Sequence, residues 1–328
     1  NTLISSDNKG YASIHHENKF NNQFVSVFAQ GSAGDVSPNF IHSKKKRHGF
    51  LNDFDHVRDN GQKHLDAFEH IISLEKTAII PSVLKSEAFF VDMSAGDERR
   101  QSFVGVSMLR GAKEGRGMPD FFYYCIYFMA SFVHLLKKKN SVQGVKKIIL
   151  SYNGKLLNLF SLKNNRFLAR FDLILKNIYE LSLVHAVDDS WMNEVLPFSL
   201  SRVGQLVLVS LPFETTSEAG IRIEKAILNS LNSFGVNDVQ LNPYTNGYYG
   251  YLVTPEEYDE QDYEGGHCLF GKDTLNFVIE RLDEMCIEFV KPLSEEKKYK
   301  NLRPRVVDKE KLKRRTYKIN KWIEVKNE

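Results

Sequence analysis

The succession of one buried strand and two amphipathic helices constrains the fold of this chain more than any other feature. Residues 198–211 alternate apolar with small or polar side chains around a Val-Leu-Val run, which predicts a buried strand. Residues 219–231 carry apolar side chains at helical spacing, and residues 273–289 do so again after Asp273, a predicted N-cap. A strand followed by helices predicts an α/β fold, with a mixed β-sheet core and flanking helices in a single large domain.

Composition excludes several classes of protein. Hydrophobic residues make up 42% of the 328 residues, so wholesale disorder is excluded. The 44 Lys and Arg residues nearly balance the 41 Asp and Glu residues, and the net charge of +3 argues against a dedicated nucleic-acid binder. The three cysteines form no CxxC pair and cannot build a disulfide framework.

Charge is unevenly distributed at the end of the chain. Residues 295–328 hold 13 Lys and Arg against 6 Asp and Glu. We therefore predict a catalytic domain over residues 1–294 and a basic C-terminal extension over 295–328. A solvated extension is the favoured interpretation, and weak attraction to an anionic membrane surface is the alternative.

The most apolar run of the chain, residues 121–136, predicts a helix. A membrane span needs roughly 20 apolar residues, so this run is too short to cross a bilayer. A buried helix is favoured, and a helix that lies against lipid is the alternative. Other patterns predict a helix at 53–76 with a weak point at Gly61, and strands at 24–29, 79–83, 88–91 and within 145–176.

The segment Gly34-Asp-Val-Ser-Pro-Asn39 follows the predicted strand at 24–29. Pro38 disfavours helical geometry for Ser37, so the serine hydroxyl could face a pocket from an extended turn. Gly34 permits a close backbone approach. An ordinary turn is the simpler interpretation of the same residues.

A second segment, residues 211–220, lies between the buried strand and the amphipathic helix. Glu214 would sit at the carboxyl end of the strand, where sites in open α/β sheets form, and a carboxylate there can bind metal or act as a base. The alternative is helix capping, with Thr215, Thr216 and Ser217 as candidate N-caps.

A third segment, residues 246–265, is dense in tyrosines and carboxylates. Phenols can bind a metal or donate a proton, whereas a structural turn is the alternative. Within the segment, Thr254 followed by Pro255 predicts the start of a helix. The sequence contains no HExxH motif.

Four segments together resemble the neutral ceramidases: SDNKGYAS at 6–13, GDVSPN at 34–39, PFETTSEAG at 212–220 and YLVTPEEYDEQDYEG at 251–265. The resemblance implies hydrolysis of the amide of N-acylsphingosine (ceramide) with a zinc ion. It also implies a secreted or membrane-associated protein that could contact a membrane surface peripherally. The family's zinc ligands are two histidines, one glutamate and one tyrosine, and by position the last two correspond to Glu214 and Tyr251.

The resemblance also assigns catalytic residues. Ser37 corresponds to the family's active-site serine, and Tyr263 corresponds to a pocket tyrosine that contacts the reacting group. Gly34 and Asp35, from the same motif as Ser37, are predicted to contribute to substrate binding. Ser37 could either bind the sphingoid headgroup or attack the amide itself.

This chain departs from the family pattern in two respects. The family's two zinc histidines, a pocket arginine and a further histidine precede the SDNKGYAS segment, so we expect the isolated chain to be inactive. Phe213 and Thr215 stand where the family has glycine and an aromatic residue. Two alternatives follow: another metal-dependent amide or ester hydrolase on the same scaffold, or a catalytically inactive relative that binds lipid.

Overall fold

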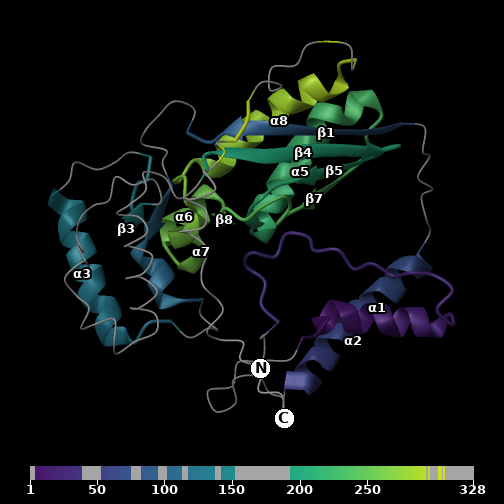
Figure 1. The fold of residues 1–328 in the computed structure, drawn as a ribbon, viewed down its shortest axis with the longest axis horizontal. Coiled ribbons are helices and arrows are strands. Elements are labelled where there is room, and N and C mark those ends of the chain that lie inside the picture. The colour runs from purple at the N-terminus through teal and green to yellow at the C-terminus, as the bar shows by residue number, and fades with distance from the viewer. Residues whose placement is uncertain are drawn as a thin grey trace. The chain divides into compact units, whose positions relative to one another are not determined.

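The computed structural model describes most of the chain, and its described residues form two compact units that are interleaved along the sequence (Figure 1). The described residues are 4–38, 53–74, 83–94, 102–112, 117–136, 142–151, 193–292, 295, 302–304 and 306. The first unit takes residues 4–38, 53–74, 83–87 and 199–248 of these, and the second unit takes the others.

A pair of packed helices occupies the N-terminal part of the first unit. They are α1 (Asp7–Lys19) and α2 (Asp53–Ser73), so the helix predicted at 53–76 is confirmed. Gly61 is not a break in α2. A Cβ built on it would lie 2.5 Å from Cδ1 of Tyr11 in α1, so the glycine lets the two helices approach closely.

The main sheet has four strands in the order β1-β4-β5-β7, and the division between the units passes through β1 and β4. β4 pairs antiparallel with β5, whereas β5 pairs parallel with β7. The sheet is therefore mixed, and the predicted α/β class with flanking helices is confirmed. The strands are β1 (Leu84–Asp92), β4 (Val195–Val203), β5 (Leu206–Ser210) and β7 (Asp238–Asn242).

Two strand predictions need correction. The single strand predicted at 198–211 is an antiparallel hairpin of β4 and β5, because the chain reverses at Gly204, whose φ is 61°. The strand predicted at 24–29 is wrong, since these residues have no regular secondary structure. Val25 and Val27 are 82% and 83% exposed, so the alternating pattern does not mark a side-chain face that is buried in a core.

Helix α5 (Ser217–Leu231) connects the parallel strands β5 and β7, and it packs on β7. It follows the short strand β6 (Glu214–Thr215) and ends in the 3-10 turn η5 (Asn232–Phe234). Its buried side chains include Ala219, Ile223 and Ile227, which confirms the amphipathic helix predicted at 219–231. The β5-α5-β7 arrangement is a βαβ unit, which joins parallel neighbours.

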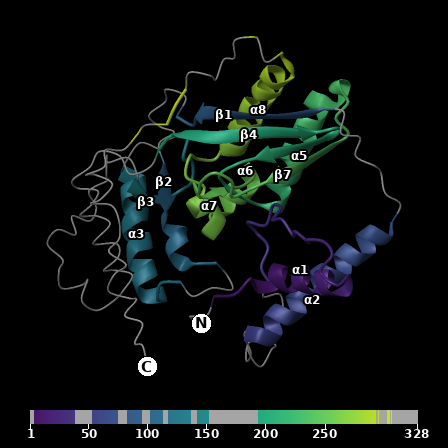
Figure 2. The same cartoon turned by 45° about the vertical axis from the view of Figure 1, so that its right-hand side comes forward.

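The second unit holds a two-stranded antiparallel ribbon and several helices, and two views show α3 beside β3 (Figures 1 and 2). Helix α7 contacts η2, β2, α6 and β8. The elements are β2 (Phe103–Gly105), η2 (Val106–Arg110), α3 (Asp120–Leu136), β3 (Ile148–Ser151), β8 (Tyr251–Leu252), α6 (Pro255–Glu260), α7 (Tyr263–His267) and α8 (Thr274–Val290).

Helix α3 confirms the helix predicted at 121–136, but only one of its faces is buried. Tyr123 and Ala130 pack with Val106 of η2, whereas Phe121 and Leu135 are 73% and 82% exposed. The favoured interpretation of a buried helix is therefore confirmed for the face that carries Tyr123 and Ala130, and it is wrong for the face that carries Phe121 and Leu135. Across the described residues, every helix is too short or too polar to cross a bilayer.

Some predictions fall on residues outside the described part of the chain. These include most of the basic extension at 295–328, most of the strand at 79–83 and the strands predicted beyond Ser151 within 145–176. The boundary between residues 294 and 295 stays a prediction. Two other predictions are confirmed: α8 begins after Asp273 at the N-cap position, and α6 begins after Thr254 with Pro255 in its first turn.

Candidate active site

The GDVSPN motif packs against the strand that carries Glu214, within the first unit. The backbone N–H of Gly34 donates to the carbonyl of Thr215 at 2.8 Å. A Cβ built on Gly34 would lie 3.1 Å from the carbonyl oxygen of Glu214, which is closer than a real side chain usually comes. Glycine is therefore suited to this close backbone approach. A contribution of Gly34 to substrate binding stays a prediction.

Asp35 reaches the first turn of α5. Its Oδ1 accepts hydrogen bonds of 2.8 Å from both the backbone N–H and the hydroxyl of Ser217. Thr216 occupies the N-cap position but makes no side-chain capping bond. The helix is thus capped from a distant segment instead of by its own threonines, because the Asp35 carboxylate satisfies an N–H that the helix itself leaves unpaired.

Glu214 lies among tyrosine phenols. The hydroxyl of Tyr248 donates to Oε2 of Glu214 at 2.6 Å. Burial raises the pKa of Tyr244 to about 12, and the negative charges of Glu214 and Asp35 add to this rise. Tyr244 is therefore a neutral phenol near neutral pH, beside two carboxylates. Together these groups form an acidic cluster of the first unit that presents phenol donors.

Ser37 completes the motif in the first unit. Its side chain is partly buried, two residues after the exposed Asp35. Next to it, Nε2 of His56 in α2 donates to the carbonyl of Pro38 at 3.1 Å, because a carbonyl can only accept. The structure therefore brings Gly34, Asp35 and Ser37 into the same unit as Glu214.

Tyr251 and Tyr263 contact each other in the second unit. Their ring centroids lie 5.6 Å apart in an edge-to-face arrangement, a favourable geometry for aromatic pairs. Tyr251, in β8, is only 7% exposed, and Tyr263 begins α7. The two tyrosines that the resemblance singled out are thus neighbours, although their assigned roles stay predictions.

His267 joins this pair, and sequence reasoning missed it. Its ring centroid lies 5.9 Å from that of Tyr251 and 6.5 Å from that of Tyr263. Burial lowers the pKa of His267 to about 4, and the positive charge of Lys146 acts in the same direction. The imidazole is therefore neutral at pH 7. Its position four residues after Tyr263 places both on one helical turn, which was the available signal.

A buried lysine supports this aromatic group. Lys146 is fully buried, and its Nζ donates to the carbonyl oxygens of Cys268 and, at 3.3 Å, Phe103. The ammonium also lies 4.9 Å from the ring centroid of Tyr258. Burial lowers the pKa of Lys146 to about 8. The lysine thus links β2 to the residue that directly follows His267.

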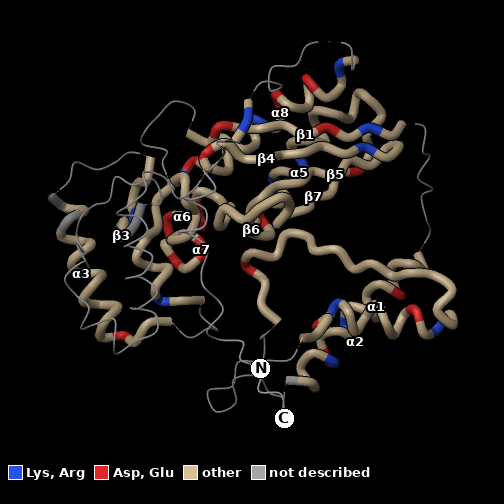
Figure 3. The backbone as a smooth tube through the Cα atoms, in the orientation of Figure 1, with Lys and Arg blue, Asp and Glu red and all other residues tan. Residues whose placement is uncertain are grey.

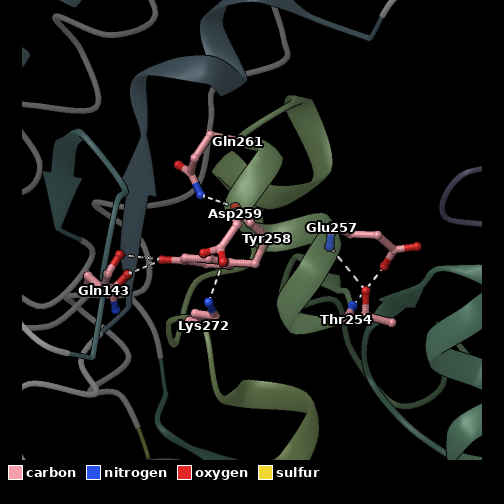
Figure 4. A network of polar contacts seen from close by, with 7 residues as sticks. All are labelled: Gln143, Thr254, Glu257, Tyr258, Asp259, Gln261 and Lys272. Atoms are coloured by element: carbon pink, nitrogen blue, oxygen red, sulfur yellow. Dashed lines mark hydrogen bonds and ion pairs between the residues drawn. The ribbon is translucent and has the colours of Figure 1, made fainter.

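The helix before α7 is held by a polar network (Figure 4). A capping box joins Thr254 and Glu257, whose side chains each accept from the other's backbone N–H. The hydroxyl of Tyr258 donates to the carbonyl of Gln143 at 2.9 Å, and Nε2 of Gln143 donates to the carbonyl of Leu269. These bonds hold α6 to Gln143 and, through Gln143, to Leu269, which follows α7.

The structure brings the two predicted metal ligands onto neighbouring strands, since Glu214 lies in β6, Tyr251 lies in β8, and β6 and β8 form a two-stranded sheet. Within the described part of the chain, His, Cys, Asp and Glu side chains form no cluster of three or more that could hold a metal. Glu214 nonetheless fits a ligand role. It is partly buried, no described Lys or Arg forms an ion pair with it, and Tyr248 fixes one of its oxygens.

Comparisons with known proteins agree on one family. A family model described as "Neutral/alkaline non-lysosomal ceramidase, N-terminal" matches residues 1–152 and 175–280. The neutral ceramidase of Pseudomonas aeruginosa is 29% identical over 297 residues, covering 83% of this chain and 38% of that protein. The neutral ceramidase of Mycobacterium tuberculosis is 27% identical over 310 residues, covering 87% and 43%.

Solved structures give the same result for the fold. A structure of a ceramidase complexed with C2 aligns with a TM-score of 0.63 at 27% identity, covering 92% of this chain and 46% of that one. The crystal structure of the Pseudomonas aeruginosa neutral ceramidase aligns with a TM-score of 0.54 at 26% identity, covering 88% and 41%. The chain therefore spans less than half the length of these relatives.

Proposed function

Because this chain belongs to the neutral/alkaline non-lysosomal ceramidase family, we propose that its protein hydrolyses the amide of N-acylsphingosine to sphingosine and a fatty acid. One observation carries the proposal beyond the family match. The GDVSPN motif is far in sequence from β6, which carries Glu214, yet a backbone hydrogen bond joins it to β6 and side-chain hydrogen bonds join it to the first residue of α5. Two of the four resembling segments therefore form one local arrangement.

The proposal includes a zinc ion held by Glu214 and Tyr251, with the two histidines of the family's ligand set. When bound, zinc would polarise the amide carbonyl and lower the pKa of a water molecule toward about 7. The carboxylate of Glu214 supports this role, because its hydrogen bond from Tyr248 orients it without neutralising its charge.

Tyr263 is proposed to donate a hydrogen bond to the carbonyl oxygen of the amide as negative charge develops there. A donor of this kind typically contributes about 3 kcal/mol to transition-state stabilisation. The packing of Tyr263 against Tyr251 restricts its ring, so less conformational freedom is lost when it binds the substrate.

Ser37 has two proposed roles that make different demands. As a headgroup ligand, its hydroxyl would hydrogen-bond the sphingoid base and stay intact. As a nucleophile, it would attack the carbonyl carbon and need a nearby base to take its proton. A trapped acyl-enzyme on Ser37 would identify the second role.

The test uses the full gene product, with zinc content and N-acylsphingosine hydrolysis measured on the same samples. We expect Glu214→Ala to lose zinc and turnover together, Ser37→Ala to keep zinc and lose turnover, and Tyr263→Phe to keep zinc with a turnover reduced about 100-fold. Asp238→Asn, an exposed carboxylate of β7 in the same unit as Glu214, is the matched control and should change neither. Full zinc content and turnover in the Glu214 and Ser37 variants would reject the proposal. For the chain by itself we expect no turnover.

The altered residues Phe213 and Thr215 motivate a second candidate, a related amide or ester hydrolase. Both side chains are fully buried, which makes them part of the core and favours an unchanged substrate. Assays with N-acylsphingosine, another fatty-acid amide and a fatty-acid ester would separate these candidates. A full gene product that binds no zinc would instead favour an inactive lipid-binding relative.

A further inference from the structure

Helix α3 exposes a continuous apolar stripe. Its four most exposed large hydrophobic side chains, among the residues that the structure describes, are Phe121, Phe128, Phe132 and Leu135, which are 73%, 67%, 62% and 82% exposed. At about 100° per residue, these four fall within roughly 60° of the helix circumference. The opposite face packs on η2 through Tyr123. Exposed apolar patches of this kind mark surfaces that bind a protein or a lipid.

Charge around α3 favours an anionic lipid surface as the occupant. The helix itself holds no Lys or Arg, and its one acidic residue is Asp120, its first residue. Figure 3 accordingly shows acidic colour at only one end of α3. Residues 110–139, which include both flanks, hold six Lys and Arg, three of them directly after the helix, against two acidic residues. Lys and Arg residues close to a membrane surface are attracted to anionic headgroups.

The length of α3 sets how it can meet a bilayer. Its 17 residues extend about 26 Å, which is less than the hydrocarbon thickness of about 30 Å. Its inner face is also occupied by the second unit, so the helix cannot be surrounded by lipid. An orientation parallel to the membrane plane, with only the apolar stripe inserted, satisfies both conditions.

We propose that α3 docks on anionic bilayers by inserting Phe121, Phe128, Phe132 and Leu135 into the headgroup and acyl boundary. Docking would give the proposed enzyme access to its substrate, because ceramide resides in a membrane, and its biological meaning therefore rests on the proposed function. The docking itself rests on the exposed stripe and its flanking charge, so it can be tested without measuring turnover.

Cys125 provides a direct probe of insertion. It is the exposed cysteine on α3, whereas Cys268 and Cys286 are buried. An environment-sensitive dye on Cys125 should shift to the blue on vesicles of phosphatidylcholine with phosphatidylglycerol, and much less on phosphatidylcholine alone. The affinity should fall with added salt, since headgroup attraction is screened. No shift on the anionic vesicles would overturn the proposal.

Variants define the surface. Phe128→Ser combined with Phe132→Ser should weaken co-sedimentation with the anionic vesicles at least tenfold, because each Phe loses its apolar transfer. The matched control combines Ile221→Ser with Ile287→Ser, two isolated apolar residues that are 58% and 62% exposed on α5 and α8. An equal loss of vesicle binding in this control would overturn the proposal. The proposal would also be overturned if the wild-type protein did not bind vesicles and instead formed a dimer that the Phe128 and Phe132 substitutions dissociate.

A final arm separates this inference from the proposed function. In the full gene product, the Phe128 and Phe132 double variant should hydrolyse a water-soluble short-chain ceramide at the normal rate and hydrolyse ceramide in anionic vesicles at least tenfold more slowly. Vesicle binding without any hydrolysis would sustain the docking surface and reject the enzyme assignment. Hydrolysis with vesicle rates equal in both proteins would reject docking by α3.

Discussion

Asp35 and Ser217 are joined by two hydrogen bonds of 2.8 Å, although 182 residues separate them. The contact places an anionic side chain at the N-terminus of α5, where unpaired N–H groups and the helix dipole favour negative charge. It also ties the GDVSPN motif to the helix that follows Glu214. The motif is therefore part of the first unit's structure as well as a candidate for chemistry.

The cap predicts that Asp35 contributes to stability. Asp35→Ala should lower the free energy of unfolding by about 1 kcal/mol, because the N–H of Ser217 loses its acceptor. Asp35→Asn keeps an acceptor oxygen and should lose less. Urea unfolding followed by circular dichroism measures both. Equal losses in the two variants would show that the negative charge, and not the hydrogen bond, stabilises α5.

The close packing of α1 on α2 predicts that Gly61→Ala destabilises the protein, although this substitution usually stabilises a helix. Helix propensity alone predicts a gain of about 1 kcal/mol, since alanine is the better helix former. The new Cβ would instead lie 2.5 Å from the ring of Tyr11, so we expect thermal unfolding at a lower temperature. Ala67→Gly, at an exposed position of α2, calibrates the propensity effect. A more stable Gly61→Ala variant would contradict the packing of α1 on α2.

The phenol bonded to Glu214 predicts an effect on metal affinity. Tyr248→Phe removes the donor to Oε2 and should weaken zinc binding by the full gene product by about 10-fold or more. Competition with a zinc-binding dye measures this affinity directly. Tyr124→Phe, an exposed tyrosine of α3, is the control. Unchanged zinc affinity in Tyr248→Phe would argue against Glu214 as a ligand.

The lowered pKa of Lys146 predicts a dependence of stability on pH. Between about 8, its pKa in the folded protein, and 10.5, its ordinary value, the unfolded chain binds a proton that the folded chain does not. The free energy of unfolding therefore rises as pH increases through that window, and this gain is lost as pH falls back to about 8, below which both states carry the proton. Relative to Lys146→Met, the wild type should gain about 3 kcal/mol across it. Urea unfolding of both proteins at about pH 7.5 and about pH 10.5, close to the two ends of the window, measures this difference. An equal change in the free energy of unfolding of the two proteins between these pH values would show that Lys146 is not buried as a cation.

Several elements were predictable from local pattern alone. The helix at 219–231 has a strong apolar period, and Thr254-Pro255 with Glu257 forms the predicted helix start with a capping box. Local pattern failed at residues 24–29, which alternate like a strand but have no regular secondary structure. It also merged β4 and β5, because a buried hairpin and one long strand share the same period.

In the candidate site, too, some residues were predictable from local motifs and others were not. Motif resemblance selected Gly34, Asp35, Ser37 and Glu214, and the fold brings these residues into one unit. It could not select His267, whose ring lies beside Tyr251 and whose pKa is lowered by burial and by the charge of Lys146. Such environments depend on segments distant in sequence, so no local window contains the information.

The sequence by itself determined the mixed α/β class, the amphipathic helices and the family, because periodicity, capping residues and motifs are local properties of the chain. Only the tertiary structure decided that Asp35 caps α5, that Lys146 is buried against carbonyl oxygens, and that α3 leaves an apolar stripe exposed. These features depend on which surfaces meet, and burial is a property of the packed chain that no single segment encodes.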